Sequence, residues 1–216
     1  MTSRAPVVEA LRLRGPAGLI QGRKECPADR EPRGVALVCH PHPLHGGTMD
    51  NKVVYTLARS FLTLGCAVIR FNYRGVGASE GSYGDGIGEA EDADAVATWI
   101  QQQWPDIPLF LGGFSFGAMV VLTANQDLSP DGLVTVAPPV AHLPADISQP
   151  GCPWLVMQGN EDEIVDADAV IDWLNSLEPG PELRVMSGAD HFLHGRLIEL
   201  GDNVIEFFKP QLSVEP

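Results

Sequence analysis

The chain has 216 residues, of which 44% are hydrophobic and 19% are charged, and its formal net charge is −14. These fractions exclude a disordered or fibrous protein, and the length favours a single domain over residues 1–216. Because nucleic acids and anionic membranes bind basic faces, so acidic a chain is expected to bind neither. No apolar run approaches membrane-spanning length and the first residues contain no signal-peptide core, which predicts a cytoplasmic protein.

The predicted elements begin with two more polar segments, at about residues 7–13 and 18–24, which favour antiparallel edge strands. Apolar runs follow at 34–40, 66–72, 108–113, 132–137, 153–159 and, more weakly, 182–188. Helical patterns separate them at about 50–64, 88–103, 116–126, 166–176 and 195–209. Near-continuous apolarity is typical of parallel strands that are covered on both faces. The alternation predicts an α/β fold with helices on both faces of a mostly parallel sheet, and a site at the carboxyl ends of the strands.

The four cysteines predict neither a disulfide framework nor a thiolate metal site. Cys26, Cys39, Cys66 and Cys152 are separated by 13, 27 and 86 residues and form no C-x-x-C pair. Cys39 and Cys66 lie in or beside apolar runs, where a free thiol behaves as a small core residue. We therefore expect free thiols.

The loop after the first apolar run, HPHPLH, contains three of the six histidines. His40 and His42 have the H-x-H spacing of many zinc hydrolases, so a zinc-dependent hydrolase is one hypothesis. Leu44 stands where the metallo-β-lactamase-type motif H-x-H-x-D-H has its aspartate, and after His45 the next histidine is about a hundred residues away. The sequence therefore favours a site without a metal or cofactor.

The pattern G-x-S-x-G occurs twice, around Ser79 and around Ser115. Ser79 lies in a polar, glycine-rich loop that no helical pattern follows, and we interpret it as a turn residue. Ser115 follows the run 108–113 and leads directly into an apolar helical pattern. A strand, a tight turn and a helix are the context of a nucleophile elbow, in which the helix N-terminus favours a developing oxyanion. Ser115 is therefore the predicted nucleophile.

A nucleophilic serine needs a base to take its proton. His191 follows the run 182–188 and should return to the same sheet edge as Ser115, so we predict that it is the base. His194 is expected inside the first turn of the last helix, a less suitable position. His142 is interpreted as a solvated loop residue.

The base in turn needs an acid that orients it. Asp162, after the run 153–159, is the predicted acid, whereas its neighbours Glu161, Glu163 and Asp166 are interpreted as a solvated cap of the next helix. Asp190 adjoins His191, but sequence neighbours rarely point at one another. The chain order of serine, aspartate and histidine is that of the α/β-hydrolase fold.

Five ordered segments resemble the α/β-hydrolase superfamily, and more closely the small, lidless carboxylesterase-like serine hydrolases related to dienelactone hydrolase. They are CHPHPLHGGTMDNKVVYTLARSF, RFNYRGVGASEGSY, GGFSFGA, MQGNEDEIVD and DHFLHGR. Two departures stand out: Asn72 replaces the acid of the family's D-x-R-G-x-G-x-S loop, and Ser115 replaces the cysteine nucleophile of dienelactone hydrolases. Only about 16 residues separate the runs 132–137 and 153–159, too few for a helical cap.

The resemblance implies one α/β-hydrolase domain of about 7–8 strands without a cap, which cleaves small soluble esters or thioesters through an acyl-enzyme. In such enzymes one oxyanion donor is the N–H after the nucleophile, here Phe116, and the other lies in the loop after the third strand. Pro41 and Pro43 carry no N–H, so His42 or Leu44 supplies the second, and the resemblance favours His42. A catalytically silent α/β-hydrolase that serves as a binding module is the remaining alternative. The sequence makes no prediction about oligomeric state.

Overall fold

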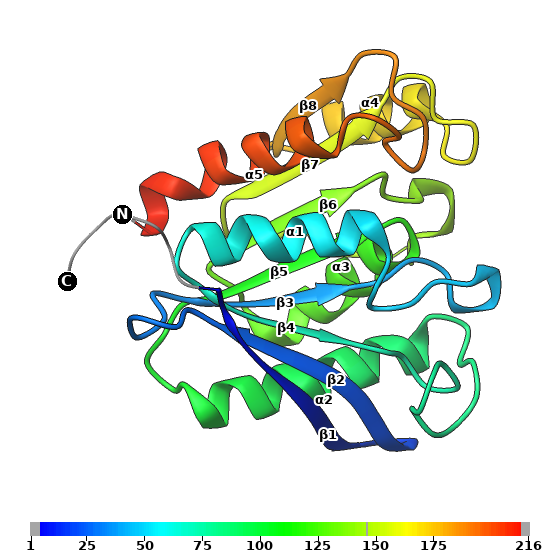
Figure 1. Cartoon of the computed structure of the whole chain (residues 1–216). Coiled ribbons are helices and arrows are strands. Elements are labelled where there is room, and N and C mark those ends of the chain that lie inside the picture. The colour runs from blue at the N-terminus through cyan, green and yellow to red at the C-terminus, as the bar shows by residue number, and fades with distance from the viewer. Residues whose placement is uncertain (1–4, 146, 213–216) are drawn as a thin grey trace.

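The computed structural model describes residues 5–145 and 147–212, which form an eight-stranded sheet with helices on both faces (Figure 1). The strands are β1 (Val7–Gly15), β2 (Gly18–Cys26), β3 (Val35–Cys39), β4 (Ala67–Phe71), β5 (Leu109–Phe114), β6 (Gly132–Val136), β7 (Trp154–Gly159) and β8 (Glu182–Met186). Their order in the sheet is β1-β2-β4-β3-β5-β6-β7-β8, with β3 to β8 parallel and β1 and β2 antiparallel at one edge. The predicted fold class is confirmed, as is the antiparallel edge. The prediction of a protein without a signal peptide rests in part on residues 1–4, which lie outside the described residues.

Five helices cover the sheet. They are α1 (Lys52–Thr63), α2 (Ile87–Gln103), α3 (Phe116–Leu128), α4 (Ala167–Asn175) and α5 (Leu197–Leu212). The helices α1 and α5 lie together on one face, and α2, α3 and α4 cover the other (Figure 1). None of the helices in the described ranges is both long and apolar enough to span a membrane.

Burial explains the uninterrupted apolar runs. Every residue of β3, β4, β5, β6 and β7 is buried, because each face of these strands meets a helical layer. The edge strand β8 is buried only at Met186, which accounts for its weaker pattern. The four cysteines are free, and Cys39 and Cys66 are buried in the core as expected.

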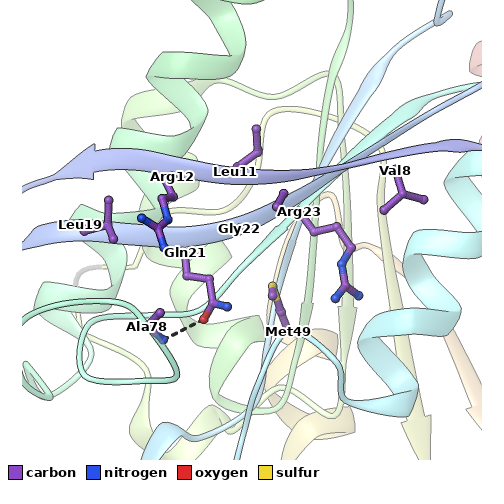
Figure 2. Close-up of a pocket in the computed structure, with 10 residues that line it drawn as sticks. Val8, Leu11, Arg12, Leu19, Gln21, Gly22, Arg23, Met49 and Ala78 are labelled. Atoms are coloured by element: carbon purple, nitrogen blue, oxygen red, sulfur yellow. Dashed lines mark hydrogen bonds between the residues drawn. The ribbon is translucent and has the colours of Figure 1, made fainter.

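The hairpin β1–β2 is fastened to the loop that follows β4. Gln21 Oε1 on β2 accepts hydrogen bonds from the Ala78 backbone N–H (2.8 Å; dashed in Figure 2) and from Asn72 Nδ2 (2.9 Å). Ser79 Oγ accepts the Gln21 N–H and donates to the Asn72 carbonyl. Ser79 is thus a buried structural residue of this loop, and Asn72, which replaces the family's acid, joins the loop to β2.

The last helix begins later than predicted. Leu193 and Gly195 have φ angles of 53° and 73°, which a right-handed helix does not allow, so α5 starts at Leu197. His194 therefore lies in the preceding turn and not inside the helix. The described residues between β6 and β7 form one short turn, η2 (Val140–His142), and no helical cap.

Candidate active site

Ser115 occupies a tight turn between β5 and α3. Its φ and ψ angles are 54° and −119°, a conformation that costs a non-glycine residue on the order of 1–3 kcal/mol and is typical of nucleophile elbows. The chain closes tightly around this turn: a Cβ on Gly113 would lie 2.2 Å from the Gly117 carbonyl oxygen, and one on Gly117 would lie 2.4 Å from that of Cys39. The two glycines of G-x-S-x-G are therefore required by packing.

His191 brings its imidazole to Ser115 from the loop after β8. Its Nδ1 lies 2.8 Å from Asp162 Oδ2, and its Nε2 lies 3.0 Å from Ser115 Oγ. Because a carboxylate can only accept, Nδ1 carries the proton and Nε2 accepts from the serine hydroxyl. The ring packs between Phe114 and Phe192, with centroid distances of 5.0 and 5.1 Å. These contacts leave the imidazole one orientation.

Asp162 is held by four hydrogen bonds, and its side chain is 0% exposed. Oδ1 accepts the backbone N–H groups of Ile164 (2.9 Å) and Val165 (2.7 Å). Oδ2 accepts from His191 Nδ1 and from Gln158 Nε2 (3.2 Å). Burial raises the pKa of Asp162, and the hydrogen bonds from His191, Val165 and Ile164 lower it. Together the hydrogen bonds outweigh burial, so the pKa of Asp162 lies below its ordinary value. The carboxylate therefore stays ionised beside the imidazole.

Of the other acidic residues near this triplet, one has a partner that the sequence did not predict. Glu163 accepts the backbone N–H of His191 at 3.2 Å, so it is more than part of a solvated cap. Asp166 does cap α4, where it accepts the N–H groups of the first turn. Asp190 accepts a hydrogen bond from His194 Nδ1 at 2.7 Å on the exposed surface, and it is His191 whose ring lies against Ser115 Oγ.

The loop after β3 supplies a candidate oxyanion donor. His42 and Phe116 both line the cavity at Ser115, and within the described residues neither backbone N–H donates a hydrogen bond. The N–H of Leu44 instead donates to His42 Nδ1 at 3.2 Å. Because the Leu44 N–H is already engaged, His42 and Phe116 are the candidate oxyanion donors, and this assignment stays a prediction.

His40 is a structural residue and not a free ligand. It is fully buried; its Nε2 accepts the Tyr73 N–H (3.2 Å) and its Nδ1 donates to the Pro41 carbonyl (2.7 Å). Burial lowers the pKa of His40 to about 4. Since both ring nitrogens are occupied, the zinc hypothesis loses its first ligand. Among residues 5–145 and 147–212 no group of three or more His, Cys, Asp or Glu residues is placed to hold a metal ion.

A cavity of about 630 Å³ opens in front of Ser115. Its apolar wall includes Phe116, Met119 and Val140, and no lysine or arginine of the described residues contributes to its lining. The polar lining residues are His42, His45, Tyr83, Asp85, Ser115, His142 and Asp166. His142, which the sequence placed in a solvated loop, is exposed but also lines this cavity.

A separate cavity of about 330 Å³ lies on the hairpin β1–β2, beside Arg12 and Arg23 (Figure 2). Ser115, Asp162 and His191 do not line it. The chemistry therefore belongs to the larger cavity.

The contacts of Gln158 with Asp162 and of Glu163 with the His191 backbone were not predicted from the sequence. Gln158 left one signal, a polar residue inside an otherwise apolar, fully buried strand. Glu163 left none, because its carboxylate meets the backbone of a residue 28 positions away.

The sheet topology and the serine at its strand–helix turn define the class of this protein as an α/β serine hydrolase. Residues 30–149 match the family model described as serine aminopeptidase, S33. The chain belongs to this family.

Solved structures agree with this assignment. XC6422 from Xanthomonas campestris, an α/β serine hydrolase without a lid, is 43% identical, with a TM-score of 0.92 over 97% of both chains. An α/β serine hydrolase homologue from Coxiella burnetii is also 43% identical, with a TM-score of 0.87 over 92% of this chain and 96% of that one. The uncharacterized protein RP471 of Rickettsia prowazekii is 34% identical over 204 residues, 89% of this chain and 85% of the relative. The resemblance to lidless α/β serine hydrolases is confirmed.

Proposed function

We propose that this serine hydrolase cleaves small carboxylic esters or thioesters through an acyl-enzyme, with Ser115, His191 and Asp162 as its catalytic triad. The observation that carries the proposal is the continuous hydrogen-bonded chain from Ser115 Oγ through His191 to Asp162 Oδ2, with distances of 3.0 and 2.8 Å. Both distances lie within the range that proton transfer requires.

In the acylation step, Ser115 Oγ attacks the carbonyl carbon of the ester while His191 Nε2 takes the hydroxyl proton. The oxyanion receives hydrogen bonds from the N–H groups of His42 and Phe116, of which each contributes about 3 to 4 kcal/mol to transition-state stabilisation. His191 then protonates the departing alkoxide or thiolate, which leaves an ester on Ser115. Asp162 remains ionised and stabilises the imidazolium.

Water completes the cycle. His191 removes a proton from the attacking water, a second tetrahedral intermediate forms in the same oxyanion site, and the proton passes to Ser115 Oγ as the acid leaves. The open cavity and the absence of a cap among the described residues support small substrates that do not need a lid to exclude water.

The charges of the residues that line the cavity also favour uncharged substrates. Its lining contains the carboxylates Asp85 and Asp166 and, within residues 5–145 and 147–212, no lysine or arginine. An anionic acyl group would therefore find no cation among these residues to bind. The proposed substrates are therefore neutral esters with short apolar acyl groups. Small thioesters of the same acyl groups fit the same cavity.

The proposal is tested with Ser115→Ala and p-nitrophenyl butyrate. We expect the variant to lose on the order of 10⁴-fold or more in kcat and to escape labelling by a fluorophosphonate probe, while its thermal unfolding stays cooperative. An aminoacyl p-nitroanilide assayed in parallel examines peptide-type substrates. Undiminished ester hydrolysis by Ser115→Ala would refute the proposal, and so would cleavage of the anilide alone.

A further inference from the structure

Gln158 is an amide inside the apolar strand β7, and it is fully buried. Burial of an amide is costly unless its polar atoms find partners. Nε2 donates to Asp162 Oδ2 (3.2 Å) and to the Gly159 carbonyl (3.1 Å), whereas Oε1 has no donor among the described residues. The NH₂ group of this buried amide therefore has partners, one of which is the triad residue Asp162, and its oxygen has none among the described residues.

The orientation of the amide follows from its neighbours. The two oxygens next to Nε2, Asp162 Oδ2 and the Gly159 carbonyl oxygen, can only accept hydrogen bonds. The side-chain group that faces them is therefore the NH₂ group and not the amide oxygen. An unpaired buried acceptor such as Oε1 costs about 1–3 kcal/mol. Buried polar groups without a partner are rare in folded proteins, and a role in an active site is one reason why such a group is kept.

Gln158 donates to the same oxygen that accepts from His191. The backbone amides of Ile164 and Val165 hold Oδ1 of Asp162, and Gln158 occupies the lone pair of Oδ2 that His191 does not use. Rotation of the carboxylate would break bonds at both oxygens. Gln158 thus completes the set that fixes the carboxylate plane.

We propose that Gln158 is a positioning residue of the triad. It holds the Asp162 carboxylate so that Oδ2 presents one lone pair to His191 Nδ1, and it thereby keeps the imidazole aligned on Ser115. The proposal rests on the proposed function, because it assumes that Asp162 orients the base. Gln158 does not line the substrate cavity, so it acts on the rate and not on substrate binding.

Gln158→Met, of similar length but without a donor, is the first test. We expect kcat for p-nitrophenyl butyrate to fall about tenfold with KM unchanged, since one hydrogen bond to a charged group is lost. Wild type and Ser115→Ala are assayed in the same series. If they do not differ, the proposed function fails; if they differ but folded Gln158→Met has the wild-type kcat, only the role of Gln158 fails.

Gln158→Glu gives a signature that a merely structural role would not produce. Its carboxyl donates to Asp162 while it is protonated and repels the Asp162 carboxylate once it is ionised. Between pH 5.5 and 9.5, we expect kcat of this variant relative to wild type to be highest at the acidic end and to fall as the pH rises. Equal losses for the Glu and Met variants at every pH would overturn the proposal.

Thr135→Val is the matched control. Thr135 is fully buried on β6 and accepts a hydrogen bond from Trp154 Nε1 (3.0 Å); among the described residues no hydrogen bond joins its side chain to the triad. We expect it to lower the melting temperature and to leave kcat within about twofold of wild type. If this control also lost tenfold in kcat, the effect of Gln158→Met would be a general consequence of destabilising the sheet. That result would contradict the proposal.

Discussion

The ring and the backbone of His42 have separate tasks. The backbone N–H is the proposed oxyanion donor, whereas ring Nδ1 accepts from the Leu44 N–H and Nε2 lies 3.4 Å from the Tyr83 hydroxyl. Burial and the stacked His45 imidazole lower the pKa of His42, so the ring is neutral. The ring therefore holds the loop, and under the proposed function the backbone N–H is the group that binds the oxyanion.

Two variants separate these tasks. His42→Asn keeps an acceptor for the Leu44 N–H, and we expect kcat to fall less than about fivefold. A Cβ on Gly47 would lie 2.0 Å from the Pro41 carbonyl oxygen, so Gly47→Ala moves the loop and should cost about 100-fold in kcat, the value of one oxyanion donor. Steady-state kinetics measure both. The opposite ranking would assign the chemistry to the ring.

The buried neutral imidazole of His40 makes stability depend on pH. In the unfolded chain it gains a proton below its ordinary pKa of 6.5, whereas in the folded protein it stays neutral down to about pH 4. Stability therefore falls as the pH drops from 6.5 to 4, by about 3 kcal/mol from this residue. Urea unfolding at pH 7 and pH 4.5 should show a smaller difference for His40→Gln than for wild type. Equal differences would show that His40 does not contribute.

At the scale of elements, the turn from β5 into α3 depends on close contact with β3. Gly117→Ala would place a methyl group 2.4 Å from the Cys39 carbonyl oxygen. Although alanine favours a helix more than glycine does, we expect a loss of about 2 kcal/mol or more in the free energy of unfolding. Gly151→Ala, where no atom lies within 4 Å of the added Cβ, should change it by less than about 0.5 kcal/mol. Chemical denaturation measures both, and equal values would contradict the packing argument.

The sequence predicts best those elements whose residue pattern has one dominant physical cause, such as burial on both faces. Strands β3 to β7 are buried on both faces, so their apolar runs identify them. The proximity of Ser115 and His191 was predictable because each follows a strand at the carboxyl edge of the sheet. The start of α5 was not, because the positive φ of the non-glycine Leu193 leaves no mark in the sequence. The contact of Glu163 with the backbone of His191 depends on how two distant loops meet in space, which no local pattern encodes. Gln158 contacts Asp162 only four residues away, and a polar side chain in an apolar strand is its one local signal.

At the scale of the whole molecule, the charges are unevenly distributed along the chain. The net charge is −14, and residues 75–183 contain no lysine or arginine. Much of the wall of the active-site cavity comes from this part of the chain, including Asp85 and Asp166. The field at the cavity is therefore expected to disfavour anionic substrates.

A matched pair of esters tests this selectivity. We expect kcat/KM for p-nitrophenyl hexanoate to exceed that for the p-nitrophenyl monoester of adipic acid by about tenfold or more at low ionic strength, and added salt should narrow the gap. Asp85→Asn should also narrow it, whereas Asp172→Asn, an exposed carboxylate outside the cavity lining, should not. A preference for the anionic ester would contradict the account.

Whether the reaction passes through an ester on Ser115 is tested most directly by rapid mixing of the protein with p-nitrophenyl butyrate, followed by acid quench and intact-mass measurement. We expect a burst of up to one p-nitrophenolate per chain, a mass increase of one butyryl group, and its location on the peptide that contains Ser115; Ser115→Ala should show neither. Steady turnover by the wild type with no butyryl adduct under any quench condition, or an adduct on another residue that Ser115→Ala retains, would contradict the account.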